Sequence, residues 1–206
     1  MRKLKMQTQV SADGYCAGPN GELDWMQWEW DDELKNHVNL LTDSIDTILL
    51  GRKMADGFIS HWTKAAADPN DPSADFAKKM VDARKVVFTK TLDKSDPMVV
   101  RWKNTDLAKG DLAAEVAKLK NQPGKDIIVY GGSNFVSNLI QHNLIDELNI
   151  FINPTALGNG KGLPVFKERT KLALVKGQPF ACGIVVLQYK QIAGQADRTP
   201  PRKNTV

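Results

Sequence analysis

The chain has 206 residues, of which 42% are apolar and 25% are charged, and its formal net charge is +4. This composition is typical of a soluble globular protein, and the length suits a single domain with one well-buried core. No apolar stretch reaches the roughly 18 residues that a membrane-spanning helix needs. The basic residues form no dense stripe with interleaved aromatic residues, which disfavours nucleic-acid binding.

None of the two cysteines and three histidines has the spacing of a metal site. Cys16 and Cys182 lie far apart, and the N-terminus reads as a first strand, with no resemblance to a signal peptide. We therefore expect free thiols, no metal and a cytoplasmic location. The final residues, 193–206, include adjacent prolines and several basic residues, which predicts a disordered basic tail.

Apolar periodicity predicts alternating strands and helices, followed by a region of strands alone. Strands are expected at 4–10, 46–50, 85–89, 98–102, 127–130, 148–152, 172–176 and 183–190. Helices are expected at 31–42, 52–59, 73–82 and 111–120, and after Gly132 as far as Gln141. This order favours an α/β sandwich whose mixed sheet is mostly parallel and has an antiparallel edge.

The most informative stretch is KDIIVYGGSNFVSNLIQ, at 125–141. An apolar strand ends at Gly131-Gly132 and an amphipathic helix follows, which is the arrangement that holds a phosphate at a helix N-terminus. Ser133 and Asn134 are expected to cap that helix and to add polar contacts. The glycines do not form the G-x-G-x-x-G fingerprint, which disfavours an ordinary Rossmann fold, and a structural turn without a ligand is the alternative.

Two further predicted strands end in residues that suit an anion. Gly51-Arg52-Lys53 opens a helix with two cations, although a tight turn with solvated side chains explains it equally well. Thr89-Lys90 suits the 2′-phosphate that distinguishes NADP from NAD, although β propensity alone also places threonine in strands. Ligands of open α/β sheets lie beyond the carboxyl ends of strands, so Gly51, Thr89 and Gly131 are expected to converge on one crevice.

The loop after the first strand carries the candidate catalytic residues, Asp13 and Asp24. A carboxylate beside an apolar pocket can have a raised pKa and assist proton transfer, whereas Asp13-Gly14 is also a common turn pair. Ser11 and Trp25 are candidates for substrate contacts. The run of Trp25, Trp28 and Trp30 is expected either to wall a flat aromatic substrate or to pack in a core or an interface. A second glycine-rich loop, at 158–162, lacks the ending of a P-loop and is expected to be a flexible connection.

Together these segments resemble the dihydrofolate-reductase-like family, specifically the reductase (RibD C-terminal) domain of bacterial riboflavin biosynthesis and its stand-alone relatives. The resemblance rests on Ser11-Ala12-Asp13-Gly14, Ala17, Ile48 to Met54, Val87 to Lys90, Ile128 to Ser133, Leu144 to Leu148, Pro154, Leu157, Gly158 and Gly160. It covers about residues 3–191. It implies a three-layer sandwich over residues 1–192, NADPH as hydride donor and a homodimer in which the strands near 172–190 contact the second subunit.

By this resemblance, Gly51, Arg52 and Lys53 lie near the cofactor phosphates, and Thr89 and Lys90 lie near the adenosine end. The segment Gly131-Gly132-Ser133-Asn134 cradles the pyrophosphate, and Asp13 with its neighbours lines the nicotinamide and substrate side. The chain departs from its relatives at Lys53-Met54, where they often carry a small or hydroxyl residue followed by threonine. Asp13 is the first candidate proton donor and Asp24 the second.

The leading interpretation is an NADPH-dependent reductase that transfers a hydride to a small conjugated substrate of pteridine or pyrimidine type. The second is the riboflavin-pathway 5-amino-6-(5-phosphoribosylamino)uracil reductase, here without a fused deaminase because the zinc deaminase signature is missing. The third is an NADPH-binding protein without catalysis, which would bind the coenzyme and turn over no substrate. Nucleic-acid binding through the basic ends is the least favoured.

Overall fold

The computed structural model describes residues 1–158 and 165–192, and one eight-stranded sheet runs through this part of the chain. Its strands are β1 (Leu4–Val10), β2 (Ile45–Gly51), β3 (Arg84–Phe88), β4 (Thr105–Ala108), β5 (Asp126–Val129), β6 (Glu147–Ile152), β7 (Leu172–Pro179) and β8 (Val185–Gln191). The helices are α1 (Asp32–Asp43), α2 (Arg52–Ala67), α3 (Ala74–Asp82), α4 (Pro97–Val100), α5 (Leu112–Lys120) and α6 (Ser133–Gln141). The predicted tail at 193–206 and most of the glycine-rich loop at 158–162 lie outside the described residues.

The sheet has the strand order β4-β3-β2-β5-β1-β6-β8-β7. Strands β1 to β6 pair in parallel, and β8 is antiparallel to both β6 and β7. The prediction of a mostly parallel sheet with an antiparallel edge is confirmed. Because neighbouring parallel strands are in register, the carboxyl ends of β2, β5, β1 and β6 lie along one edge of the sheet.

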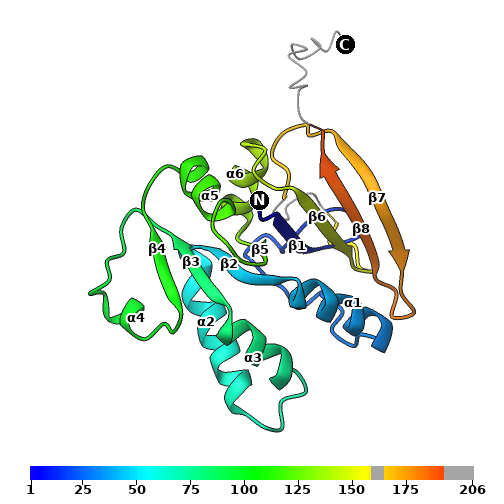
Figure 1. Cartoon of the computed structure of the whole chain (residues 1–206). Coiled ribbons are helices and arrows are strands. Elements are labelled where there is room, and N and C mark those ends of the chain that lie inside the picture. The colour runs from blue at the N-terminus through cyan, green and yellow to red at the C-terminus, as the bar shows by residue number, and fades with distance from the viewer. Residues whose placement is uncertain (159–164, 193–206) are drawn as a thin grey trace.

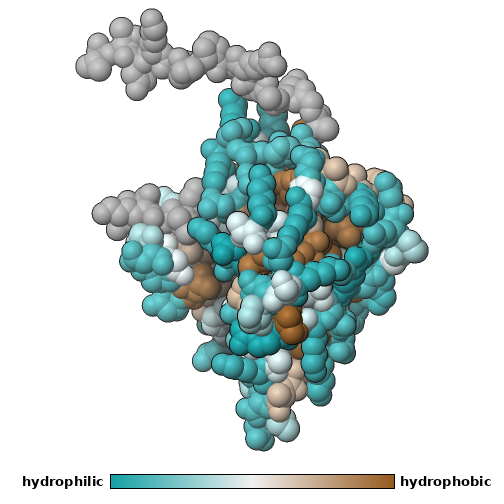
Figure 2. All heavy atoms as spheres, turned by 90° about the vertical axis from the view of Figure 1, so that its left-hand side faces the viewer, coloured by the Kyte–Doolittle hydropathy of each residue, from teal (hydrophilic) through white to brown (hydrophobic). Residues whose placement is uncertain are grey.

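Helices cover both faces of the sheet, which gives three layers (Figure 1). Alternate residues of a strand face opposite sides, so Ile127 and Val129 pack in the cluster with α5 and α6, whereas Ile128 packs in the cluster with α2 and α3. A third cluster lies under α1 and includes Leu34 and Phe151. The side of the molecule that carries β4 and α4 exposes mainly hydrophilic residues, with a few apolar patches (Figure 2).

The strand predicted at 98–102 is wrong, because Pro97–Val100 forms the short helix α4. The Asp96 carboxylate accepts the N–H of Met98 at 2.9 Å, and Pro97 occupies the first helical position, where its missing N–H has no cost. The strand of this region is β4, which pairs only with β3 among the described strands. Helix α2 extends to Ala67, well past the predicted end at Ile59.

The opposite edge of the sheet, at the amino ends of the strands, holds buried cations in ion pairs. Arg2 contacts Asp46, and the Lys120 ammonium lies 2.6 Å from Asp146. Pairs of this kind neutralise buried charge and fix the amino ends of the strands. The edge at the carboxyl ends of the strands, in contrast, carries the predicted anion-binding segments at Gly51, Thr89 and Gly131.

Candidate functional site

Two helices begin at neighbouring strand ends without a side-chain cap. Gly51 is the N-cap of α2 and Gly132 is the N-cap of α6, and within residues 1–158 and 165–192 neither helix start has a side-chain cap hydrogen bond. By contrast, α1, α4 and α5 begin at Asp31, Asp96 and Asp111, whose carboxylates each accept a first-turn N–H. We call residues 51–53 and 131–134 the paired helix starts. Their open N–H groups and partial positive charge suit an anion.

Close packing at the glycines brings the paired helix starts together. A Cβ on Gly51 would lie 2.9 Å from the Cβ of Phe135, so a larger residue there would push α6 away. A Cβ on Gly131 would lie 3.5 Å from the Sδ of Met54, in α2. Gly132 has φ of 82°, a left-handed conformation that favours glycine, and it turns the chain from β5 into α6. Gly51 and Gly131 therefore lie close together, and their convergence with Thr89 on one ligand crevice stays a prediction.

The predicted capping of α6 by Ser133 and Asn134 is wrong, because these residues are the first two of the helix and Gly132 is its N-cap. The Asn134 Oδ1 accepts a hydrogen bond from the Lys167 ammonium at 2.6 Å. The Ser133 carbonyl accepts the hydroxyl hydrogen of Ser137 at 2.6 Å. The N–H groups at the start of α6 therefore keep no cap from these side chains, and Lys167 adds a cation beside them.

Arg52 and Lys53 are exposed and occupy the first two positions of α2. The first turn of α2 contains no acidic residue, and neither does that of α6. Cations at a helix N-terminus oppose the helix dipole, typically by about 0.3–1 kcal/mol each. Such a local conflict is common at functional sites, and here a bound anion would relieve it.

Thr89 and Lys90 follow β3, whose last residue pairs with Gly51 of β2. The buried Thr89 hydroxyl accepts the N–H groups of Thr91 and Leu92, both at 3.1 Å, so it shapes the turn after β3. Lys90 is exposed on that turn. Of the two predicted contacts with a 2′-phosphate, the Thr89 hydroxyl thus has an internal structural role, whereas Lys90 stays a candidate.

The predicted rise in the pKa of Asp13 is wrong. Its carboxylate accepts hydrogen bonds from the Ser11 hydroxyl at 2.6 Å and from the N–H groups of Leu157 and Gly158 at 3.0 and 2.8 Å. These bonds, that of Ser11 first, lower the pKa of Asp13 to about 2. Asp13 is therefore ionised at neutral pH and ties its loop to the segment after β6. The Ser11 hydroxyl also accepts the Tyr15 N–H, so both groups are engaged within the loop.

Asp24 is exposed in a turn of the same loop, and the half-buried Trp25 donates its indole N–H to the Glu22 carbonyl at 3.0 Å. The tryptophan run divides between core and surface. Trp30 packs against the cluster under α1, whereas Trp28 is 61% exposed and its ring centre lies 5.8 Å from that of Trp30. The structure therefore places these candidates on the loop after β1, and not among the paired helix starts.

Sequence reasoning missed Asn153, which is fully buried directly after β6. Its Nδ2 donates to the Gln9 Oε1 at 2.7 Å, and its Oδ1 accepts the Gln27 N–H at 2.9 Å. Asn153 thus joins the ends of β1 and β6 to the tryptophan segment. An asparagine between a buried strand and Pro154 is the sequence signal that identifies such a position.

Comparison with known proteins gives the same family as the sequence motifs, because residues 2–186 match the RibD C-terminal domain. The chain belongs to the RibD C-terminal domain family. It is 33% identical over 189 residues to the uncharacterized protein YyaP of Bacillus subtilis strain 168, covering 91% of this chain and 94% of that protein. It is 28% identical over 169 residues to the uncharacterized protein YwjB of the same organism, covering 82% of this chain and 85% of that protein.

Solved structures share the fold of this RibD C-terminal domain. A protein from Shewanella sp. PV-4 named for riboflavin biosynthesis has a TM-score of 0.64 and 22% identity, with 92% of this chain and 99% of that chain covered. A pyrimidine reductase-like protein from Corynebacterium diphtheriae has a TM-score of 0.62 and 14% identity, with 94% and 93% covered. The deaminase and 5-amino-6-(5-phosphoribosylamino)uracil reductase of Thermotoga maritima has a TM-score of 0.59 and 18% identity, with 93% of this chain and 57% of that chain covered. The predicted fold is thereby confirmed.

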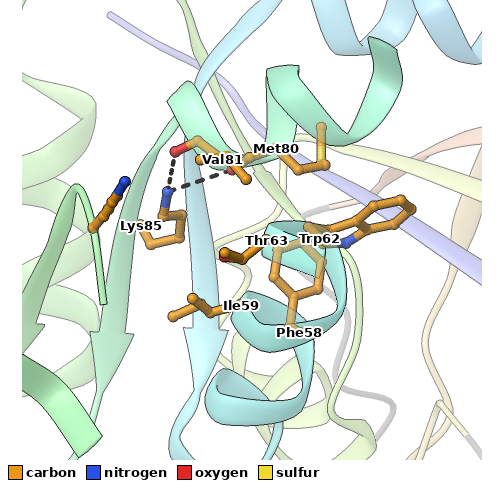
Figure 3. A pocket seen from close by; sticks show the side chains of 8 residues that line it. Phe58, Ile59, Trp62, Thr63, Met80, Val81 and Lys85 are labelled. Carbon is orange, nitrogen blue, oxygen red and sulfur yellow. Dashed lines mark hydrogen bonds between the residues drawn. The ribbon is translucent and has the colours of Figure 1, made fainter. Parts of the chain in front are cut away.

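A small cavity in this RibD C-terminal domain lies away from the paired helix starts, between α2 and α3 (Figure 3). Its volume is about 10 Å³, room for a single water, and Lys85 at the start of β3 lines it. The Lys85 ammonium donates to the carbonyls of Val81 at 2.5 Å and Met80 at 3.4 Å, near the end of α3. Burial lowers the pKa of Lys85 to about 8. The lysine thus satisfies carbonyl groups near the end of α3, whose C-cap residue is Ala83.

Within residues 1–158 and 165–192, no group of three or more His, Cys, Asp or Glu side chains is placed to hold a metal ion. Across the same residues, no helix combines the length and the apolar character needed to cross a membrane.

Proposed function

We propose that the protein is an NADPH-dependent reductase that transfers a hydride to a small conjugated substrate of pteridine or pyrimidine type. The observation that carries the proposal is the pair of uncapped helix starts after β2 and β5. Membership of the RibD C-terminal domain family supports it, as do the reductase names of proteins that share the fold.

The donor set at the paired helix starts fits a pyrophosphate. The first turns of the two helices present backbone N–H groups and the cations Arg52 and Lys53, without an acidic residue. Lys167 adds a cation beside Asn134. In this proposal, the N–H groups of α6 and the glycine turn at Gly131-Gly132 hold the phosphates, and Lys90 contacts the adenosine end. The bound coenzyme would supply the hydride, and the protein would align and shield the reacting groups.

The proton that completes the reduction needs a source other than Asp13. A carboxyl group with a pKa of about 2 is a poor acid at neutral pH. Asp24, on the same loop and exposed, and a solvent water remain as the candidate donors. Asp13 then acts as a positioning residue that holds the loop after β1 against the segment after β6.

The decisive experiment is titration of the protein with NADPH and with NADH, followed by coenzyme fluorescence. Arg52→Ala is expected to weaken both coenzymes about five- to tenfold, because a charge-assisted hydrogen bond to phosphate is lost. Lys90→Ala should weaken NADPH more than NADH. Lys64→Ala, in the last turn of the same helix α2, is the matched control and should change neither affinity. A wild-type protein that binds neither coenzyme contradicts the proposal.

The riboflavin-pathway reductase activity is the narrower alternative, supported by the names of the Thermotoga maritima protein and of the yeast reductase Rib7, which has a TM-score of 0.57 and 18% identity. NADPH oxidation with 5-amino-6-(5-phosphoribosylamino)uracil, compared with oxidation by unphosphorylated pteridines and pyrimidines, separates the two. Binding of NADPH without turnover of any of these compounds would favour the non-catalytic alternative.

We also propose a homodimer formed through β7 and β8. Strand β7 is an edge of the sheet, and Leu174 and Val175 on it are 59% and 50% exposed. An edge strand offers unpaired backbone groups to a second strand, and exposed apolar side chains favour burial in an interface.

A further inference from the structure

The thioether of Met54 lies against the glycine turn that connects β5 to α6. A Cβ on Gly131 would lie 3.5 Å from the Met54 Sδ, and a Cβ on Gly132 would lie 4.0 Å from the same atom. These are contact distances, so the sulfur occupies the space that a side chain at the turn would otherwise take. Because Met54 belongs to the first turn of α2, it connects the two helix starts directly.

The junction of α2 with α6 has little room to rearrange. A Cβ on Gly51 would come within 2.9 Å of the Cβ of Phe135, so the start of α2 and the first turn of α6 are packed closely. Met54 also packs against the buried cluster with α2 and α3. Closely packed interiors respond to the addition of single atoms. An oxygen atom added to the Met54 sulfur would therefore displace the glycine turn or the start of α2.

Met54 differs from other methionines of the chain in exposure and in position. Met6 and Met80 are 0% and 1% exposed, which shields their sulfur atoms from solutes. Met26 and Met98 are partly buried, as Met54 is, but they lie in the loop after β1 and in α4. Met54 thus combines partial exposure to solvent with contact to the paired helix starts.

Oxidation of a thioether by a hydroperoxide needs no second protein group. The sulfur lone pair attacks one peroxide oxygen, the O–O bond breaks, and the leaving hydroxide or alkoxide takes the proton of the transferred oxygen. Sulfur is oxidised to a sulfoxide, and the peroxide is reduced to water or an alcohol. The sulfoxide oxygen accepts hydrogen bonds. Since the described side chains leave the starts of α2 and α6 uncapped, this oxygen would compete there with a phosphate.

We propose that Met54 is a modification site through which hydroperoxides control coenzyme binding. As a thioether, Met54 supports the glycine turn. As a sulfoxide, it displaces the turn and offers its own oxygen to the open N–H groups. The change is reversible, because methionine sulfoxide reductases restore the thioether. The inference rests on the proposed reductase function and adds a means of regulation at the same site.

The test measures NADPH affinity by coenzyme fluorescence before and after treatment with hydrogen peroxide, and each protein is compared with its own untreated sample. Peptide mass spectrometry identifies the methionines that have gained oxygen. The wild type is expected to lose at least about tenfold in affinity, because the phosphates lose hydrogen bonds at the displaced turn. Met54→Leu replaces the thioether by an apolar side chain that peroxide does not oxidise, so treatment should leave its affinity unchanged.

Met98→Leu, in α4, is the matched control, and treatment should weaken its affinity as much as that of the wild type. Incubation of the treated wild type with a methionine sulfoxide reductase should restore the affinity, which separates a reversible modification from permanent damage. Saturating NADPH should slow the oxidation of Met54 and leave the rate at Met98 unchanged, because coenzyme binding and this modification oppose each other.

Three results would overturn the inference. They are a Met54 that stays unoxidised while Met98 gains oxygen, an affinity that oxidation of Met54 leaves unchanged, and an equal loss of affinity in Met54→Leu. Failure of the reductase proposal is distinguishable, because the untreated protein would then bind no NADPH, and both proposals would fall together. An untreated protein that binds NADPH and keeps its affinity after oxidation of Met54 contradicts only the role of Met54.

Discussion

At the scale of single residues, Asp13 links two segments that are far apart in the chain. Its pKa falls from 3.8 to about 2 because it accepts hydrogen bonds from Ser11, Leu157 and Gly158. A carboxylate whose folded pKa is lowered stabilises the fold above its unfolded pKa, and this contribution is lost as the pH falls towards the folded pKa.

Replacing Asp13 by asparagine therefore has an effect that depends on pH. Asp13→Asn should lower the urea midpoint at neutral pH, and the difference from the wild type should shrink between pH 3.8 and about 2. Urea unfolding at several pH values measures it. A difference that stays constant through this window would show that the carboxylate charge has no such role.

Lys85 makes stability rise with pH as Asp13 does, but in a basic pH range. Its pKa falls from 10.5 to about 8 because it is buried, so the unfolded chain binds this proton more strongly than the folded protein does. The stability of the wild type should therefore rise relative to Lys85→Met as the pH increases from about 8 towards 10.5. Parallel urea midpoints of the two proteins over that range test the expectation, and midpoints that move together would contradict it.

At the scale of elements, the starts of α2 and α6 depend on the absence of a side chain at Gly51. Gly51→Ala would place a Cβ 2.9 Å from the Cβ of Phe135, and we expect a loss of about 1–3 kcal/mol of stability from overpacking. Coenzyme affinity should fall with it, because the two helix starts would separate.

Gly57→Ala in the middle of α2 is the matched control, since a Cβ there meets open space. That change should raise stability by about 0.5–1 kcal/mol through helix propensity and leave coenzyme binding unchanged. Denaturant unfolding and NADPH titration of both variants provide the measurements. Equal stability of the two variants would show that α6 yields to the added methyl group.

Periodicity was sufficient to predict the main strands and helices, because most central strands are apolar runs and most helices have one apolar face. It failed at 98–102, where Met98, Val99 and Val100 form an apolar run but the Asp96-Pro97 start signal prevails. The strand β4 was missed because TDLA is a short edge strand with little apolar character.

The candidate site was predictable only in outline. The glycine turns and cations of the paired helix starts are visible in the sequence, and so is their place at strand ends. The environment of Asp13 was not predictable from the sequence, because its pKa depends on N–H groups at residues 157 and 158, which only the fold brings near. The same holds for Gly132, since the sequence does not reveal which residue of the turn adopts the left-handed conformation.

At the scale of the whole molecule, the two edges of the sheet differ. The β4 side is mainly hydrophilic (Figure 2). At the other edge of the sheet, β7 exposes Leu174 and Val175. Val175→Lys should convert the proposed dimer to a monomer, because two lysines would be buried against each other. Val100→Lys is the control, as Val100 is 69% exposed in α4 on the opposite side. Light scattering after size-exclusion chromatography measures the molar mass of the wild type and of both variants. A monomeric wild type would contradict the proposed dimer.

The central position of β1 has a consequence for synthesis of the protein. Strand β1 precedes the other described strands in the chain and its neighbours in the sheet are β5 and β6, so both of its edges are completed only after residue 152 has been translated. The nascent chain must therefore keep Leu4 and Met6, both fully buried in the finished fold, from aggregating until β6 has been synthesised. Chaperone demand should accordingly depend on how quickly ribosomes reach the codons of β6.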